Sequence, residues 1–229
     1  MSAPRKQLEV TPELLLRAYS IGLFPMAEER ESKDLFWVDP EERGVFPLDG
    51  VVVSKSLAKV VRADRFEVVA NRDFAGTMRA CAERDKTWIN DQILQLYTAL
   101  HSHGFAHSVE VYQDGAMVGG LYGVHVGAAF FGESMFHRAR DASKVALVHL
   151  VARLRFAGFR LLDAQFVTPH LASLGCVEIT RAAYRKKLND AVRENADFEA
   201  FPSSKPMNGA TALRLALDER VRKATPVTA

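Results

Sequence analysis

An apolar run over residues 128–136, with the sequence AAFFGESMF, contains a single carboxylate at Glu133. A short apolar run of this kind is typical of a buried β-strand. A carboxylate that is buried among apolar side chains costs several kcal/mol unless it is paired or hydrogen-bonded. The chain is therefore expected to place partners around Glu133, which makes this residue the first candidate for a functional site.

The residues around this run predict an antiparallel meander followed by a crossover helix. Strands are expected over residues 107–112, 116–124, 128–133 and 159–165, and a helix is expected over residues 142–157. Asp114-Gly115 between the first two strands is a hairpin signal. Antiparallel strands followed by a helix and a further strand make an α+β layout. This order is compatible with an acetyltransferase-like fold.

The chain before the meander is expected to contain a separate small module. Thr11 and Pro12 mark the start of a helix, since Thr is a good N-cap and Pro suits the first helical position. Residues 23–50 contain three prolines and are expected to be irregular. Residues 1–40 are therefore predicted to form a small N-terminal domain, and residues 41–229 a larger domain that ends in a helical tail.

Composition and charge exclude several classes of function. The chain has 229 residues and a net charge of +2, so any contact with nucleic acid must be local, and a general DNA-binding role is not expected. Its two cysteines have no zinc-binding spacing and suit a reducing cytosol. The chain has no signal-peptide pattern and no membrane-spanning run. A cytoplasmic protein without a metal ion or other cofactor is expected.

Two polar residues near the end of the strand at 159–165 extend the candidate site. Asp163 and Gln165 are two residues apart, so a regular strand points both side chains to the same side. If this strand lies beside the strand that carries Glu133, the three polar groups converge in one cleft. The alternative is a satisfied structural network at the strand ends. Ser134 lacks the second glycine of a Gly-x-Ser-x-Gly nucleophile elbow, which argues against a serine hydrolase.

Basic and aromatic residues indicate where a nucleic acid could bind. Lys55, Lys59 and Arg62 have helical spacing and could contact phosphates, or they form an ordinary solvated face. Trp88 and Tyr97 could stack on bases or belong to the core. A second basic group, at residues 138–144, lies where an anion could bind at a helix start. That segment has no glycine, which argues against a coenzyme A pyrophosphate loop.

A set of ordered motifs gives the chain a specific resemblance. The motifs are Tyr19-x-x-Gly22-Leu23-Phe24-Pro25, Thr87-Trp88-Ile89, His107-Ser108-Val109-Glu110, Gly119-Gly120-Leu121-Tyr122-Gly123-Val124, Gly132-Glu133-Ser134-Met135-Phe136, Ala142-Ser143-Lys144, Asp163-x-Gln165 and Ala172-Ser173-Leu174-Gly175. Together they resemble the leucyl/phenylalanyl-tRNA–protein transferase family, from about Leu15 to about Leu188.

The resemblance implies a fold and a reaction. The fold is a small N-terminal domain followed by an acetyltransferase-like (GNAT-like) domain with a central, mostly antiparallel sheet. The reaction moves Leu or Phe, with Met as a further donor, from aminoacyl-tRNA to the N-terminal amine of proteins that begin with Arg or Lys. The product is a degradation signal in the bacterial N-degron pathway, and no cofactor is implied.

The resemblance also assigns residues to roles. Asp163 and Gln165 would be the catalytic pair, and Glu133 with Ser134 would hold the polar end of the aminoacyl-adenosine. Trp88 would stack on the terminal adenine, with Tyr19 and Tyr97 nearby. The apolar aminoacyl pocket would consist of Leu121, Phe130, Met135, Leu147, Leu150, Leu154 and Leu162. Lys55, Lys59 and Arg62 would contact the tRNA backbone.

Some positions depart from the family pattern. Met26 stands where the family often has Trp, which removes one stacking face for the adenine. Two other functions remain open at this stage, a coenzyme A-dependent N-acyltransferase and a non-catalytic tRNA- or peptide-binding module.

Overall fold

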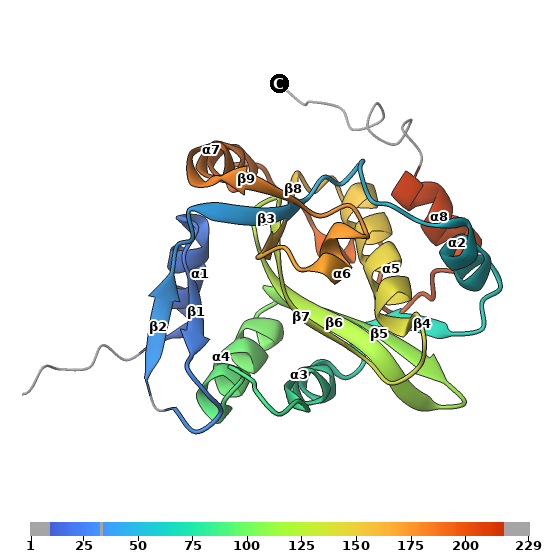
Figure 1. Cartoon of the computed structure of the whole chain (residues 1–229), viewed down its shortest axis with the longest axis horizontal. Coiled ribbons are helices and arrows are strands. Elements are labelled where there is room, and N and C mark those ends of the chain that lie inside the picture. Colours follow the sequence, from blue (N-terminus) through green and yellow to red (C-terminus); the bar gives the residue numbers. More distant parts are fainter. Residues whose placement is uncertain (1–9, 33, 218–229) are drawn as a thin grey trace, which may run out of the picture.

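The computed structural model describes residues 10–32 and 34–217 (Figure 1). The helices are α1 (Pro12–Ser20), α2 (Lys55–Arg62), α3 (Phe74–Ala82), α4 (Asp91–Ser102), α5 (Ala142–Phe156), α6 (Pro169–Ala172), α7 (Arg181–Ala191) and α8 (Gly209–Leu217). The strands are β1 (Phe24–Ala27), β2 (Leu35–Val38), β3 (Glu42–Phe46), β4 (Glu67–Ala70), β5 (Ala106–Gln113), β6 (Ala116–Val126), β7 (Ala129–His137), β8 (Leu161–Gln165) and β9 (Val177–Thr180).

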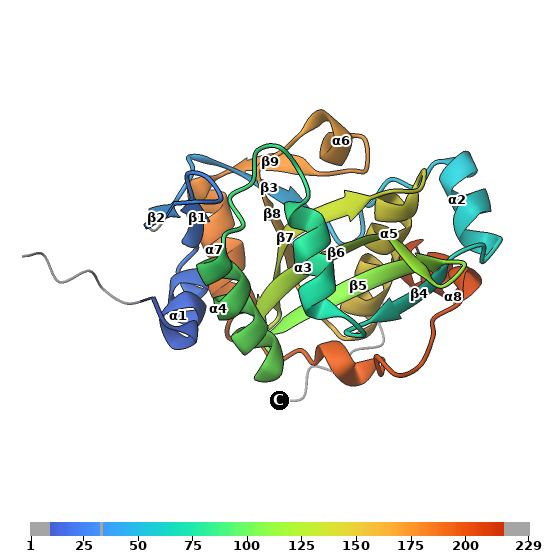
Figure 2. The same ribbon diagram turned by 90° about the horizontal axis from the view of Figure 1, so that it is seen from below.

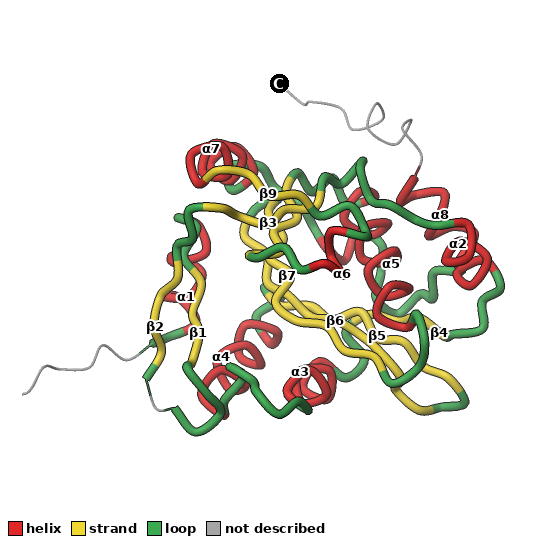
Figure 3. Tube along the Cα trace, viewed as in Figure 1, coloured by secondary structure: helices red, strands yellow, loops and turns green. Residues whose placement is uncertain are grey.

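The central sheet has seven strands in the order β4-β5-β6-β7-β8-β3-β9. All neighbouring strands are antiparallel except β7 and β8, which α5 connects as a parallel crossover. Figure 3 shows the strands of this sheet curving between the two groups of helices. The expected α+β class and the mostly antiparallel central sheet are confirmed.

Helices cover both faces of the sheet, and each face has its own apolar core. Figure 2 shows α3 and α4 in front of the strands and α5 behind them. Successive residues of a strand point to opposite faces. Accordingly, Phe130 belongs to the core beneath α5 and α8, and Phe131 belongs to the core with α1, α3 and α4. The crossover helix α5 is buried along most of its length, and apolar residues make up most of its sequence.

The expectation of an irregular segment over residues 23–50 is wrong. The segment contains β1 and β2, which form a separate two-stranded sheet, and β3, which lies between β8 and β9. Pro25 is tolerated because it lies in this small sheet, where each strand has only one partner. The small N-terminal part packs on the main body through buried residues of α1, including Leu15 and Tyr19. Strands β4 and β9 were also not predicted.

Side-chain N-caps mark the starts of three helices, including the helix start predicted at Thr11. Thr11, Asp73 and Asn90 each accept a backbone hydrogen bond as side-chain N-caps of α1, α3 and α4. Asp141 precedes α5 but does not cap it, because its backbone is left-handed, with a φ of 68°. The helical tail expected at the end of the larger domain includes α8, and its remainder, from residue 218, lies outside the described residues.

Candidate active site

Two adjoining cavities open at the carboxyl end of β8. The first, of about 100 Å³, is a narrow slot between α5 and strands β6, β7 and β8. The second, of about 340 Å³, is more open and includes Trp88 and Met26 in its wall. Both cavities are lined by Glu133 and Gln165, so these two polar residues lie at the junction. The convergence expected from the sequence is present.

Glu133 lies at this junction and is hydrogen-bonded on both carboxylate oxygens. Tyr19 Oη donates to Oε1 at 2.8 Å, and Tyr97 Oη donates to Oε2 at 3.2 Å. The two phenols also contact each other through their hydroxyl groups. Burial raises the pKa of Glu133 to about 8, although the tyrosine hydrogen bonds oppose this shift. The site therefore holds a carboxylate whose charged form gains from a nearby cation.

Asp163 is fully buried and forms an ion pair with Arg43. Arg43 donates from Nε to Oδ1 at 2.9 Å and from Nη2 to Oδ2 at 2.6 Å. Tyr184 Oη adds a third donor to Oδ2 at 2.7 Å. Burial alone would lower the pKa of Arg43, but the hydrogen bonds to Asp163, the charge of Asp163 and the nearby Tyr184 and Glu133 together raise the pKa. The guanidinium lies between the rings of Phe24 and Tyr184, 4.6 and 4.4 Å from their centroids.

Gln165 adopts a backbone conformation that is unusual for a residue with a side chain. Its φ is 56°, and the Phe166 amide donates to the Ala164 carbonyl at 2.6 Å, which closes a tight turn around it. Asp163 Oδ1 accepts the backbone N–H of Gln165 at 2.9 Å and so fixes this turn. The Gln165 side chain reaches Glu133, with Nε2 to Oε1 at 3.1 Å. Strained backbone held by surrounding structure is common at functional sites.

Gly44 of β3 allows this turn to approach the sheet. A Cβ atom at Gly44 would lie 2.8 Å from the backbone carbonyl carbon of Phe166, which is too close for any side chain. Gly44 also pairs with Gln165 in the sheet register. Strand β3 therefore carries both the arginine that holds Asp163 and the glycine that admits the turn.

Five of the seven predicted aminoacyl-pocket residues line the slot. These are Leu121, Met135, Leu147, Leu150 and Leu162. The other two do not line it: Phe130 packs against Phe159 and Phe198, and Leu154 is fully buried elsewhere along α5. Phe130 and Leu154 belong to elements that line the slot, but their side chains point into the core beside it. Phe46, Tyr122 and Leu171 also line the slot.

The aromatic residues expected around an adenine separate into two groups. Trp88 is half-buried and lines the open cavity together with Met26 and Phe24. Tyr19 and Tyr97, in contrast, are fully buried and hold Glu133, so no ring face is open to a base. Ser134 lines both cavities, and its hydroxyl accepts a hydrogen bond from Arg84 Nη2 at 2.6 Å.

The three basic residues expected to contact tRNA are exposed on α2. Lys55, Lys59 and Arg62 lie outside both cavities, with their side chains in solvent. Helix α2 packs on α8 through its buried side, which includes Leu57 and Val61. The basic face is therefore available to a partner.

Sequence reasoning missed three residues that hold the site together. Arg43 and Tyr184 orient Asp163, and Arg84 positions Ser134. Arg43 lies in the segment that was expected to be irregular, and Tyr184 lies on α7, for which no site residue was predicted. Neither residue carries a local signal, because each acts through the pairing of β3 with β8 or the docking of α7.

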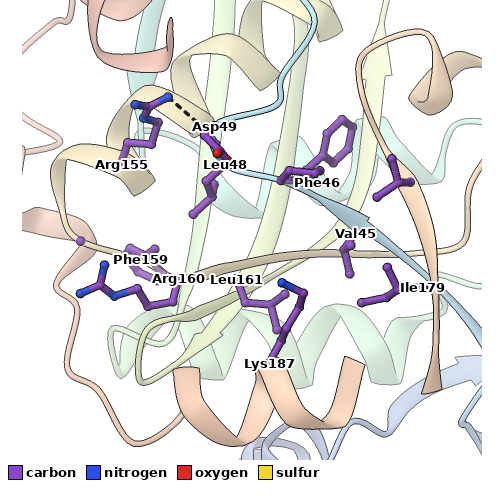
Figure 4. Close-up of a pocket in the computed structure, with 13 residues that line it drawn as sticks. Val45, Phe46, Leu48, Asp49, Arg155, Phe159, Arg160, Leu161, Ile179 and Lys187 are labelled. Atoms are coloured by element: carbon purple, nitrogen blue, oxygen red, sulfur yellow. Dashed lines mark hydrogen bonds between the residues drawn. The ribbon is translucent and has the colours of Figure 1, made fainter. Parts of the chain in front are cut away.

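A further cavity, of about 580 Å³, lies at the opposite end of β8 (Figure 4). It includes Leu161 at the start of the strand, with Arg155, Arg160 and Lys187 around it. None of the predicted site residues lines it. In the described part of the chain there is also no group of histidine, cysteine or acidic residues that could hold a metal ion. Within the same residues, no helix has the length and apolar character needed to cross a bilayer.

Comparison with known proteins assigns the family. Residues 45–189 match the family model of leucyl/phenylalanyl-tRNA protein transferase, and residues 9–41 match the model of its N-terminal domain. A leucyl/phenylalanyl-tRNA–protein transferase of Rhodopseudomonas palustris (strain HaA2) is 58% identical over 211 residues, which cover 90% of this chain and 94% of that protein. That of Cereibacter sphaeroides is 58% identical, over 82% of this chain and 88% of its own length. With two family models covering most of its length and relatives this similar, the chain belongs to the leucyl/phenylalanyl-tRNA–protein transferase family.

Proposed function

We propose that this enzyme transfers Leu or Phe, with Met as a further donor, from aminoacyl-tRNA to the N-terminal amine of proteins that begin with Arg or Lys. The product would be a degradation signal of the bacterial N-degron pathway. Since its donors are charged tRNAs, the enzyme would work in the cytoplasm, where these tRNAs are made and used. The relatives carry the name of this activity, and their organisms are bacteria.

The observation that carries the proposal is the apolar slot that ends at Glu133 and Gln165. The aminoacyl side chain enters the slot among Leu121, Leu147 and Leu150. Its α-ammonium group lies near Glu133, where a cation favours the charged carboxylate. A hydrophobic pocket discriminates by only about 1–3 kcal/mol per methylene group, so several unbranched-at-Cβ side chains are accepted. Phe130 and Leu154 support the slot from the core and do not touch the donor.

Asp163 and Gln165 prepare the acceptor amine for attack. Asp163, held by Arg43, accepts the backbone N–H of Gln165 and fixes the turn that aims its side chain at the junction. The neutral amine nitrogen attacks the ester carbonyl carbon, a C–N bond forms, and the C–O bond to the ribose breaks. The amine proton passes to the departing ribose oxygen. Because the ester is already activated, positioning supplies much of the acceleration.

The nucleotide end of the donor occupies the open cavity. Trp88 stacks on the terminal adenine, with Met26 beside it in the same wall. Ser134 and Arg84 offer polar contacts to the ribose and its phosphate, and their mutual hydrogen bond orients them. Tyr19 and Tyr97 do not contact the nucleotide and instead hold Glu133 in place through their hydrogen bonds. Lys55, Lys59 and Arg62 contact the tRNA backbone in a largely sequence-independent way.

The proposal is tested by direct transfer. The protein is incubated with leucyl-tRNA and peptides that begin with Arg, Lys or Ala, and the products are identified by mass spectrometry. Addition of Leu to the Arg and Lys peptides and not to the Ala peptide is expected. No product from Leu, Phe or Met donors would contradict the proposed activity, and equal modification of the Ala peptide would contradict the acceptor rule.

A further inference from the structure

A groove beside α2 has the chemistry of a phosphate-binding surface. It has a volume of about 510 Å³ and lies between the start of α2, the segment before β4, the β5–β6 turn and the loop that leads into α5. We call it the α2–α5 groove and define it by its polar residues Ser54, Ser56, Arg65, Gln113, Arg140 and Lys144. Leu57, Val60 and Phe66 form its apolar floor.

The charge of the groove is positive. Arg65, Arg140 and Lys144 are cationic, and Asp141 is the only acidic residue in its lining. The Asp141 carboxylate lies 3.1 Å from Lys144 Nζ and 3.7 Å from Arg140 Nε, so one anion is shared by two cations. Arg140 is 96% exposed, and Arg65 forms no ion pair within the described residues. Arg65 and Arg140 therefore face solvent, and Lys144 is 35% exposed beside them, so the three can contact an anionic partner.

The groove approaches the site at the start of α5, although the groove and the two site cavities share no lining residue. Lys144 lies one turn before Leu147, which lines the aminoacyl slot. His170 lines the open cavity, and burial together with the positive charges of Lys144 and His137 lowers its pKa. The start of α5 is thus close to both the nucleotide cavity and the groove.

On its other side the groove meets the basic helix. Ser54 caps α2, and Lys55, Lys59 and Arg62 are exposed along the same helix. A chain of positive groups consequently leads from the nucleotide cavity, across Lys144 and Arg140, to Arg65 and the face of α2. A single-stranded nucleic acid carries one phosphate per nucleotide, so it matches a linear series of cations better than one compact cluster.

We propose that the α2–α5 groove binds the backbone phosphates of the tRNA 3′ strand just before the terminal adenosine, and guides that strand from α2 to the active site. The inference rests on the proposed transfer from aminoacyl-tRNA. It extends the tRNA-binding surface of the enzyme to Arg65, Arg140 and Lys144. The apolar floor contacts ribose or base surfaces, and Ser56 and Gln113 offer neutral hydrogen-bond donors to phosphate oxygens.

The test compares a donor that reaches the groove with one that does not. Full-length leucyl-tRNA spans the groove, whereas leucyl-adenosine reaches only the slot and the open cavity. The double variant Arg140→Ala/Lys144→Ala is measured with each donor and a peptide that begins with Arg. Its matched control is Arg160→Ala/Arg185→Ala, which removes two exposed arginines from another part of the molecule.

The groove variant is expected to raise the KM for leucyl-tRNA by about tenfold at low salt and to reduce the dependence of log KM on log salt by about 0.7 per lost contact. Its kinetics with leucyl-adenosine should match those of the unmodified enzyme, and the control should behave normally with both donors. Two results would contradict binding of tRNA phosphates in the groove. One is an unchanged KM and salt slope with leucyl-tRNA, and the other is an equal defect with both donors. Failure of the unmodified enzyme with leucyl-tRNA would instead contradict the proposed activity.

Discussion

Arg43 and Asp163 form a buried, forked ion pair directly beneath the turn that presents Gln165. Two nitrogens of the guanidinium contact the two carboxylate oxygens at 2.9 and 2.6 Å, and both side chains are almost completely buried. The same carboxylate accepts the backbone N–H of Gln165. The conformation of the proposed catalytic residue therefore depends on an arginine that has no contact with either cavity.

Arg43→Ala should unfold or severely destabilise the protein, because removal of one partner from a buried ion pair costs about 3–5 kcal/mol. Arg43→Lys keeps the charge but loses the fork, so it should fold with a lower kcat and an unchanged KM for leucyl-tRNA. Thermal unfolding and steady-state kinetics measure both effects. The control Arg185→Ala breaks an exposed pair with Asp39 and should cost about 0–1 kcal/mol. Full kcat in Arg43→Lys would contradict the positioning role.

Glu133→Gln should change how stability depends on pH. The pKa of Glu133 rises from 4.5 to about 8 on folding, so between these values the folded protein keeps a proton that the unfolded chain has lost. Its contribution to stability is therefore greatest below pH 4.5 and declines as the pH rises towards 8, by a few kcal/mol at most. The variant lacks this titration. The Tm of the variant minus the Tm of the unmodified enzyme should therefore increase as the pH rises from about 5 to about 9. Parallel Tm curves would contradict the raised pKa.

Two leucines of α5 separate the slot from the core behind it. Leu150 lines the slot and Leu154 does not, although both are almost fully buried. Leu150→Ala should enlarge the slot and shift kcat/KM towards Phe over Leu by about tenfold, in line with the 1–3 kcal/mol that a pocket methylene contributes. Leu154→Ala should lower stability by about 2–5 kcal/mol without changing the donor ratio. A changed donor ratio in Leu154→Ala would show that this residue does line the slot.

Two buried tyrosines test the hydrogen bonds around Glu133. Tyr19→Phe removes the 2.8 Å donor to Oε1, so the pKa of Glu133 should rise further and transfer near neutral pH should fall. Tyr122→Phe is the matched control: it keeps the ring that lines the slot and removes a buried hydroxyl that has no hydrogen-bond partner among the described residues. Its removal should leave stability unchanged or slightly improved. The pH profile of transfer measures the difference, and identical profiles for the two variants would contradict the role of Tyr19.

The meander and the crossover helix were predictable because their signals are local. Asp114-Gly115 marks the hairpin, and the apolar run at 128–136 marks the central strand. Glu133 was identified for a physical reason, the cost of a buried carboxylate, and Asp163 and Gln165 followed from their spacing. Strand β3 was not predictable, since its short sequence becomes a strand only between β8 and β9.

The directions of individual side chains could also not be predicted from the sequence. The regular-strand argument placed Asp163 and Gln165 on the same side, but the positive φ of Gln165 ends the strand and turns the chain there. Asp163 consequently faces Arg43 and Tyr184, whereas Gln165 faces Glu133. Phe130 and Leu154 were assigned to the slot by resemblance and lie in the neighbouring core.

The central claim is that Gln165, aimed by Asp163, holds the amine for attack on the aminoacyl ester. It is tested most directly by the single-turnover rate of Leu transfer from enzyme-bound leucyl-tRNA to a saturating peptide that begins with Arg, in Gln165→Ala and in the unmodified enzyme. We predict a rate loss of about 100-fold or more, as expected when a positioning group is removed, with the affinity for leucyl-tRNA unchanged. A normal rate in Gln165→Ala would contradict the account.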